Sequence, residues 1–296
     1  MVGPMNGAPK VTVLLPTNGR DEIIGFAIKS LLNQTLEDFE LIVVGDGCRD
    51  NTESVVNGFD DPRVIWMPFN KAPGAGYANR NLALRKARGR LIAYAQHDDL
   101  FFPDHLERCL RVFEDPRVKF AYSRPLWIDD AGLVIPSYVN LRLPGPQKSF
   151  LHQMNVLPSS NVVHLRSCFD NAGYWPDEDI PSGDWDLWKR IIKAYGWGCM
   201  RLERHPTCLH FRACWRDPKR WAPPPVPYLA AVASAGGYWP DQLRLDLKLV
   251  EREPQAQVYD LMRTSPKEFM QEIRKGVSAL QDQLAWTAGL DRNFVD

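Results

Sequence analysis

The stretch Leu91-Ile-Ala-Tyr-Ala-Gln-His-Asp-Asp99 passes from a short apolar run directly into two adjacent carboxylates. The apolar part has the length of a buried strand. Asp98 and Asp99 would then lie at its carboxyl end, where open α/β sheets bind ligands. Their oxygens suit a hard divalent cation, which can in turn hold a diphosphate. The same pattern occurs where Leu41-Ile-Val-Val44 runs into Gly45-Asp46-Gly47, so the two strand ends together predict a nucleotide site.

Strand-like and helix-like segments alternate on both sides of this stretch. Such alternation favours a mostly parallel sheet with right-handed crossovers and flanking helices, a Rossmann-like α/β fold. The second half is less regular, with a strand candidate at 162–165 and an amphipathic helix at 184–194. In the first half the predicted strands are 11–15, 39–44, 63–66, 91–95 and 118–122, and the predicted helices are 21–32, 50–56, 77–87 and 105–113.

The composition excludes several classes of protein. Lys and Arg total 36, as do Asp and Glu, so zero net charge argues against nucleic-acid binding through bulk charge. No apolar run approaches 18 residues, so we expect no transmembrane segment, and the first ten residues lack the apolar stretch of a signal peptide. The six cysteines are scattered without a CxxC pair, which favours reduced thiols and a cytoplasmic location.

Several motifs, in this order, resemble those of the inverting family 2 glycosyltransferases, which use nucleotide sugars and have the GT-A fold. The resemblance covers about residues 10–215. Each motif is weak alone, but their order makes the combination specific. They are the opening strand and loop 11–20, the segment Val43-Val-Gly-Asp-Gly-Cys-Arg-Asp-Asn-Thr52, Ala78-Asn-Arg-Asn81, Gln96-His-Asp-Asp99 and Gly183-Asp-Trp-Asp-Leu-Trp188.

The resemblance implies roles for particular residues. Asp184 would be the general base that removes the proton of an acceptor hydroxyl. Asp98 would bind a divalent metal, Mn²⁺ or Mg²⁺, with Asp99 as its helper on the donor side and His210 as a late metal ligand. The residues expected to bind the donor are Pro16, Thr17, Asn18, Arg20, Asp46, Arg80 and Asp99. The two arginines would neutralise the diphosphate, because a guanidinium matches phosphate oxygens.

Structural explanations compete with these roles. Asp46 could simply be a turn residue between two glycines, and Asp184 could be an acid that caps its helix. His210 could be a histidine that makes hydrogen bonds within the core. The chain also departs from the family pattern, with Gly45 and Gln96 at positions where acids are common. Gly45 removes one contact expected to the base or ribose, and Gln96 implies either lower metal affinity or a larger share of the metal ligation from the diphosphate.

The motifs suggest a domain division. We expect a flexible N-terminus at 1–10 and a GT-A domain at 11–220, with a nucleotide-sugar half (11–122) and an acceptor half (123–220). A Pro-rich linker at 221–227 would then lead into a helical tail that continues to residue 296, with helices at 241–250 and 265–286. This tail could form a homodimer.

The function that follows is transfer of a sugar from a nucleoside-diphosphate sugar, most simply a UDP-sugar, to a glycan or lipid-linked acceptor in glycan, glycolipid or polysaccharide biosynthesis. The expected location is the cytoplasm, with peripheral contact at the inner face of the membrane as an extension. Two alternatives stay open. One is a sugar nucleotidyltransferase, although Pro16–Arg20 is a poor version of its Gly-rich loop. The other is a catalytically degenerate protein that only binds nucleotide sugars or acts as a scaffold.

Overall fold

The computed structural model describes residues 7–129, 132–178, 180, 182–211, 238–248 and 252–288, with side chains described as far as residue 284. The strands are β1 (Val11–Thr17), β2 (Phe39–Asp46), β3 (Val64–Phe69), β4 (Leu91–Tyr94), β5 (Leu100–Phe101), β6 (Phe120–Ser123), β7 (Leu126–Ile128), β8 (Val134–Pro136), β9 (Val162–Leu165), β10 (Met200–Glu203) and β11 (Cys208–Phe211). The α-helices are α1 (Ile24–Leu32), α2 (Thr52–Asn57), α3 (Tyr77–Leu84), α4 (His105–Val112), α5 (Pro144–His152), α6 (Cys168–Ala172), α7 (Gly183–Tyr195), α9 (Pro254–Thr264) and α10 (Pro266–Ala288).

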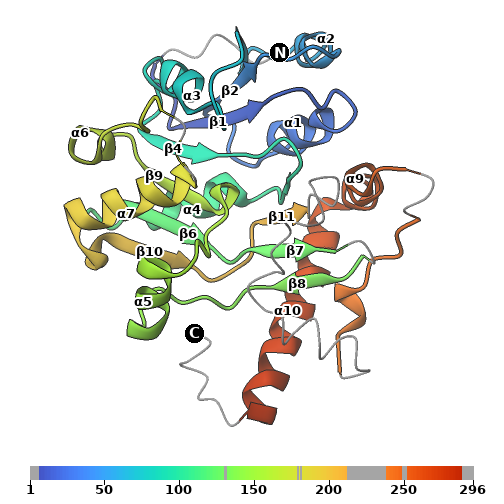
Figure 1. Ribbon diagram of the computed structural model, residues 1–296. Coiled ribbons are helices and arrows are strands. Elements are labelled where there is room, and N and C mark those ends of the chain that lie inside the picture. The colour runs from blue at the N-terminus through green and yellow to red at the C-terminus, as the bar shows by residue number, and fades with distance from the viewer. Residues whose placement is uncertain are drawn as a thin grey trace.

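Two sheets organise these elements (Figure 1). The larger has seven strands in the order β10-β6-β9-β4-β1-β2-β3, and the smaller has four in the order β5-β11-β7-β8. In the larger sheet β9 runs antiparallel to β4 and β6, while the other neighbours are parallel. The predicted mostly parallel α/β sheet with flanking helices is therefore confirmed. The smaller sheet, whose strands have two to four residues, was not predicted.

Strand β1 lies near the middle of the larger sheet, and all seven of its residues are buried. Both faces are covered by helices, which explains why its sequence is continuously apolar rather than alternating. Pro16 is tolerated in this central strand because pairing with β4 ends at Leu14, whereas pairing with β2 continues to Thr17. A missing N–H on the β4 side therefore breaks no ladder hydrogen bond. The chain beyond Thr17 is left as a loop at the edge of the sheet.

Helices pack on both faces of the large sheet, and each face has its own hydrophobic core. One core unites side chains of α3, α6 and α7, including the fully buried Trp188. The other unites α1, α2 and α4 on the opposite face. Burial of these apolar surfaces is the main favourable term in folding. The arrangement brings α3 and α7, which are far apart in sequence, onto the same face.

The C-terminal helices pack against the rest of the chain. Their apolar side chains, including Val258, Ile273 and Val277, form a third core with β7, β8 and β11. The predicted helix at 265–286 is confirmed by α10. The predicted helix at 241–250 is wrong for its described part, which has a short 3-10 turn at Asp241–Leu243 and then extended chain. This chain cannot remain helical because the Leu245 N–H donates to the carbonyl of Gly132, next to an isolated bridge between Leu133 and Arg244.

Other predictions about the chain's organisation are only partly covered. Residues 1–6 of the expected N-terminus and the whole Pro-rich linker at 221–227 lie outside the described residues. Among the helices that the structure describes, none is both long and apolar enough to cross a bilayer. Within the described part of α10, Met270, Ile273, Val277 and Leu280 are buried in this chain, and the homodimer stays a prediction.

Candidate active site

The loop after β1 is shaped by hydrogen bonds to the loop after β2. Thr17 Oγ1 donates to the carbonyl of Gly19, and Asn18 Nδ2 donates to the carbonyl of Asp46. The backbone N–H groups of Arg20 and of the next residue donate to Asp50 Oδ2, at 2.6 and 3.2 Å. Arg20 has a φ of 111°, a strained conformation for a residue with a side chain. The loop therefore holds its expected donor-binding residues in one defined backbone conformation.

Asp50 is the acceptor that ties these two loops together. Its carboxylate also accepts the Thr52 N–H at 3.2 Å, at the start of α2. Burial opposes its ionisation, but hydrogen bonds from Thr52, Arg20 and Asp21 outweigh that effect and lower the pKa of Asp50 to about 2. The carboxylate is thus charged at any physiological pH. The sequence motif contained Asp50 at the start of the predicted helix 50–56, a position that gave no hint of its contact with the β1 loop.

Asp46 makes hydrogen bonds with a third segment of the chain. Its carboxylate accepts from Lys71 Nζ at 2.6 Å, from the Ala72 N–H at 2.8 Å and from Asn79 Nδ2 at 2.6 Å. It is therefore more than a turn residue, since it connects the end of β2 to the segment that leads into α3. Lys71 was missed by sequence reasoning. Its one signal is its position two residues after the end of β3.

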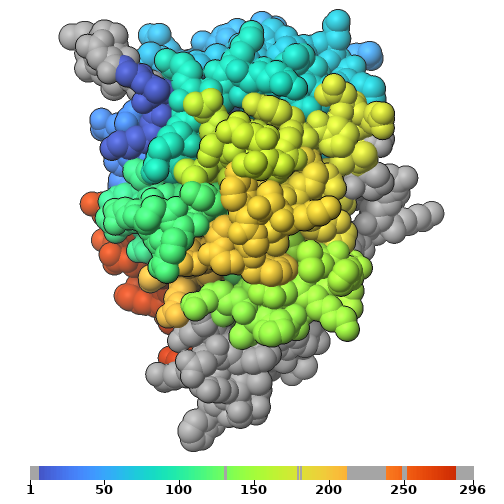
Figure 2. Space-filling model, turned by 90° about the vertical axis from the view of Figure 1, so that its left-hand side faces the viewer, coloured from blue at the N-terminus to red at the C-terminus, as the bar shows by residue number. Residues whose placement is uncertain are grey.

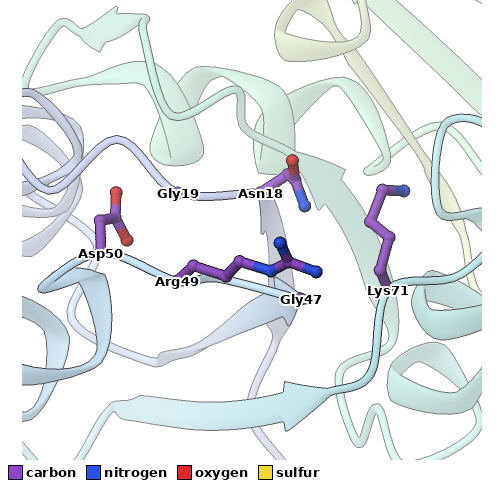
Figure 3. Close-up of a pocket in the computed structure, with 6 residues that line it drawn as sticks. All are labelled: Asn18, Gly19, Gly47, Arg49, Asp50 and Lys71. Carbon is purple, nitrogen blue, oxygen red and sulfur yellow. The ribbon is translucent and has the colours of Figure 1, made fainter.

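A cavity of about 520 Å³ opens beside these loops. Asn18 and Arg49 direct side-chain nitrogens toward the same opening, and Lys71 stands at its far side (Figure 3). Its volume falls in the usual range for small-ligand sites, and it lies at the carboxyl ends of β1 and β2, where open α/β sheets bind ligands. The cavity is lined by Asn18, Gly19, Gly47, Arg49, Asp50 and Lys71.

The two acids after β4 have different surroundings. Asp99 is wholly buried and accepts hydrogen bonds from Ser160 Oγ, from His210 Nδ1 at 2.8 Å and from the Phe211 N–H at 3.4 Å. Burial raises the pKa of Asp99, although the neighbouring His210 opposes the shift. Asp98 is only 4% exposed, yet among the described residues nothing donates a hydrogen bond to its carboxylate. Asp99 is thus occupied by protein contacts, whereas the described residues donate no such hydrogen bond to Asp98.

Asp98 and His210 have side chains of the kinds that bind a divalent cation. The described residues contain no group of three or more His, Cys, Asp or Glu side chains that could hold a metal by themselves. Mg²⁺ and similar ions, however, commonly bind one or two carboxylates and take their other ligands from substrate phosphates and water. The buried Asp98 carboxylate fits that pattern. His210 Nδ1 lies 2.8 Å from Asp99 Oδ2, and a carboxylate beside one ring nitrogen is typical of histidines that bind a metal through the other.

Gln96 occupies the position where an acid was expected, and the structure shows what it does instead. Its backbone N–H donates to Ser160 Oγ at 3.1 Å and its side-chain Nε2 donates to Ser159 Oγ. These contacts fasten the end of β4 to the short 3-10 turn before β9. The departure from the family pattern therefore serves local structure, and any metal would depend more on Asp98 and on the ligand's own oxygens.

Asp184 lies in the first turn of α7, where the cap residue is Ser182 and no side-chain capping hydrogen bond is formed. The cap residue is thus Ser182 rather than Asp184, but an acid in the first turn still complements the helix dipole, so that structural explanation for Asp184 stands. Its side chain is 20% exposed, and its Oδ1 atom is buried without a hydrogen-bond partner. Burial raises the pKa of Asp184, and the nearby Arg80 opposes the shift. A carboxylate with a raised pKa and an unused oxygen is suited to accept a proton.

Arg80 lies beside Asp184 rather than beside the β1 loop. Its Nη1 atom is 3.7 Å from Asp184 Oδ1, and its guanidinium packs over the ring of Tyr77. In the space-filling view, the cyan surface around α3 adjoins the yellow surface around α6 and α7 (Figure 2). The predicted site residues thus form three contact groups. These are the β1 and β2 loops with Asp46, the Asp99–His210 pair beside Asp98, and the Arg80–Asp184 pair.

Comparison with known proteins identifies the family of the chain. The model of "Glycosyl transferase family 2" matches residues 12–167, just over half of the chain. An uncharacterized glycosyltransferase of Methanocaldococcus jannaschii is 30% identical over 200 residues, which cover 65% of this chain and 67% of the relative. A UDP-Glc:alpha-D-GlcNAc-diphosphoundecaprenol beta-1,3-glucosyltransferase of Escherichia coli is 32% identical over 124 residues, which cover 42% of this chain and 49% of the relative.

The match does not extend over the full length of several relatives. An uncharacterized glycosyltransferase of Rickettsia bellii is 34% identical over 128 residues, which cover 43% of this chain but 18% of the relative. Among solved structures, S. aureus TarS in complex with UDP-GlcNAc aligns with a TM-score of 0.57 at 18% identity, covering 69% of this chain and 58% of that chain. At this low sequence identity, the structural alignment shows that the two proteins share a fold. The chain therefore belongs to glycosyl transferase family 2, and its fold is that of the GT-A glycosyltransferases.

Proposed function

We propose that this glycosyltransferase moves a sugar, with inversion at the anomeric carbon, from a UDP-sugar to an acceptor hydroxyl, with Asp184 as the general base. The observation that carries the proposal is the state of Asp184. Its Oδ1 atom is buried without a hydrogen-bond partner at the start of α7, and burial raises the pKa of Asp184. Such a carboxylate binds a proton more readily than an exposed one.

The chemical step balances with the residues in these roles. Asp184 accepts the proton of the acceptor hydroxyl while that oxygen forms a bond to the anomeric carbon of the donor sugar. The bond between the anomeric carbon and the phosphate oxygen breaks, and the nucleoside diphosphate leaves with the electron pair. Attack from the face opposite the leaving group inverts the anomeric carbon. One carboxylate is enough for this mechanism, because no glycosyl-enzyme intermediate is formed.

The donor would lie along the carboxyl ends of β1, β2 and β4. The 520 Å³ cavity beside Asn18 would hold the nucleoside, and the exposed Arg20 side chain on the same loop would bind the diphosphate. A divalent cation held by Asp98 and His210 would neutralise charge on the departing diphosphate. Asp99 would orient His210 through the 2.8 Å hydrogen bond. Asp46 would support the nucleoside end through the backbone segments it connects.

The relatives narrow the choice of substrates. The E. coli relative is named for UDP-Glc and a diphosphoundecaprenol-linked sugar, and the TarS structure contains UDP-GlcNAc. We therefore propose a uridine nucleotide as the donor and a glycan or lipid-linked glycan as the acceptor. A lipid-linked acceptor would place the enzyme at the inner face of the cytoplasmic membrane. Family membership favours this activity over that of a sugar nucleotidyltransferase, which the sequence alone left open.

Substitutions of Asp184 and Asp98 should impair different steps, turnover in the first case and metal-dependent binding in the second. Release of UDP from UDP-glucose and UDP-GlcNAc would be measured with Mn²⁺, alongside UDP affinity by calorimetry. We expect Asp184→Asn to lower UDP release by about 100-fold or more while it keeps Mn²⁺-dependent UDP binding. We expect Asp98→Ala to lose that Mn²⁺-dependent binding, because the chain's main metal ligand is gone.

Asp186→Asn is the matched control, since this partly buried neighbour on α7 pairs with Arg190 at 2.8 Å and not with Arg80. It should keep turnover near that of the wild type. The proposal is contradicted if Asp184→Asn, still folded by circular dichroism, releases UDP as fast as the wild type. A scaffold protein would bind UDP and release none in any variant.

A further inference from the structure

Arg80 packs against two aromatic rings that also contact each other, with 5.2 Å between the ring centroids of Tyr77 and Trp175. Its guanidinium carbon lies 4.8 Å from the ring centroid of Tyr77 and 6.0 Å from that of Trp175. Trp175 belongs to the loop between α6 and α7, and its carbonyl accepts a hydrogen bond from Asn81 Nδ2 at 2.7 Å. Cation–π contacts are strongest where the cation is desolvated, and the Arg80 side chain is 14% exposed. The guanidinium therefore has a fixed position.

The start of α7 is fixed against the same aromatic residue. A Cβ atom placed on Gly183 would lie 2.5 Å from the Tyr77 ring, so only glycine permits this approach. Asp184, the next residue, then faces Arg80 with 3.7 Å between Nη1 and Oδ1. That separation is too long for a hydrogen bond. Arg80 Nε and Asp184 Oδ1 are both buried without a hydrogen-bond partner, so the pair is electrostatic and leaves the carboxylate oxygen available.

Other titratable groups near Asp184 carry no competing positive charge. Tyr77 on α3 and Tyr94 on β4 both approach it, but burial raises the pKa of each phenol above its usual value, so both stay neutral at physiological pH. On α7 itself, Asp186 is paired with Arg190. Among the described residues, Arg80 is the cation that forms an ion pair with Asp184.

We propose that Arg80 is a positioning residue for the base, fixed by its two aromatic neighbours so that its charge orients and supports the Asp184 carboxylate, and that this, rather than binding of the donor diphosphate, is its main role. The inference rests on the proposed function for the identity of the base. The property that it adds is the control of the orientation and charge of Asp184 by Arg80.

A direction of pH dependence follows. Burial alone favours protonated Asp184, and the Arg80 charge favours the anion, so Arg80 lowers the pKa of the base relative to burial alone. A general base must be deprotonated to act, so activity falls as pH falls through its pKa. Removal of the Arg80 charge raises that pKa and moves the acid limb of the pH profile to higher pH. On that limb we expect Arg80→Gln to be slower than the wild type by roughly tenfold, with a smaller difference at alkaline pH.

The first test needs no turnover. The carboxyl carbons of ¹³C-aspartate-labelled protein would be titrated by NMR in the wild type and in Arg80→Gln, with Asp184→Asn used to assign the resonance. We expect the Asp184 titration to move to higher pH in Arg80→Gln and to stay nearer the wild-type position in Arg80→Lys, which keeps the charge. Arg85→Gln is the matched control, because Arg85 directly follows α3 and stacks on Tyr174 at 4.5 Å without an ion pair to Asp184. An Asp184 titration that is the same in Arg80→Gln as in the wild type overturns the proposal.

The second test separates this role from diphosphate binding. UDP affinity with Mn²⁺ and UDP release from UDP-GlcNAc between pH 5 and 9 would be compared for the same variants. We expect Arg80→Gln to bind UDP within about twofold of the wild type while its acid limb moves upward. A large loss of UDP affinity with an unmoved acid limb would instead assign Arg80 to the diphosphate. If the wild type neither binds UDP nor releases it, the proposed function fails, while the NMR titration still decides whether Arg80 controls Asp184.

Discussion

Single residues show why this chain departs from its family. Gly45 stands where an acid is common, and the structure gives a steric reason. A Cβ at this position would lie 2.3 Å from Cη2 of Trp66, on the neighbouring strand β3. The indole ring therefore occupies the space that any side chain at position 45 would need, and restoring the acid alone would not restore a contact.

This steric account can be tested with a double-mutant cycle. We expect Gly45→Ala to lower the free energy of unfolding by about 1–3 kcal/mol, the usual cost of overpacking. In a Trp66→Leu background the cost should fall by about 1 kcal/mol or more, since the clashing ring atoms are gone. Urea unfolding of the four proteins measures the coupling. Additive effects would show that Trp66 is not what excludes a side chain from position 45.

Among the elements, the loops after β1 and β2 depend on each other through Asp50. That carboxylate accepts the N–H groups of Arg20, Asp21 and Thr52, while Arg20 is held at a φ of 111°. Strain of this kind persists only where surrounding contacts enforce it. The β1 loop therefore has its shape because of the β2 loop, which local sequence preferences could not reveal.

Loss of this contact should loosen the β1 loop selectively. In Asp50→Ala we expect the amides of Arg20 and Asp21 to exchange with solvent about tenfold faster, because each loses a hydrogen bond to a charged acceptor. Hydrogen exchange read by NMR measures the effect, and the affinity for UDP should fall with it. Asp115→Ala is a suitable control, since this carboxylate also accepts a backbone N–H, from Arg117, at 3.0 Å. Unchanged exchange at both amides would mean that other contacts hold the loop.

At the scale of the whole molecule, the C-terminal helix α10 packs against the segment that leads to the candidate site. Arg274 on α10 donates to both carboxylate oxygens of Asp104, at 2.8 and 2.9 Å, and also to the carbonyl of Pro206. Pro206 lies just before β11, the strand that carries His210. The helix thereby braces the segment that leads to the candidate metal site, although it begins 56 residues after His210 (266 − 210).

Breaking this brace should destabilise the protein. Arg274 is 13% exposed, and its loss leaves Asp104 partly buried beside Arg108 alone, so we expect Arg274→Ala to lower the free energy of unfolding by about 2–4 kcal/mol. Arg274→Lys should recover little, because an ammonium cannot form the bidentate contact. Lys275→Ala is the control, since its pair with Glu272 is exposed and should contribute less than about 1 kcal/mol. Equal unfolding midpoints for Arg274→Ala and Lys275→Ala would contradict this role for α10.

The sequence by itself determined the alternation of strands and helices, the acids at the strand ends and the family, because apolar periodicity and motif order are local properties of the chain. The tertiary structure decided which partners each acid contacts. Asp99 meets His210 across 111 positions, and Asn81 meets Trp175 across 94. Such contacts depend on which helices share a face of the sheet, and no local pattern encodes that. For the same reason the sequence did not predict that Arg80 lies beside Asp184, a contact that arises because α3 and α7 pack on one core.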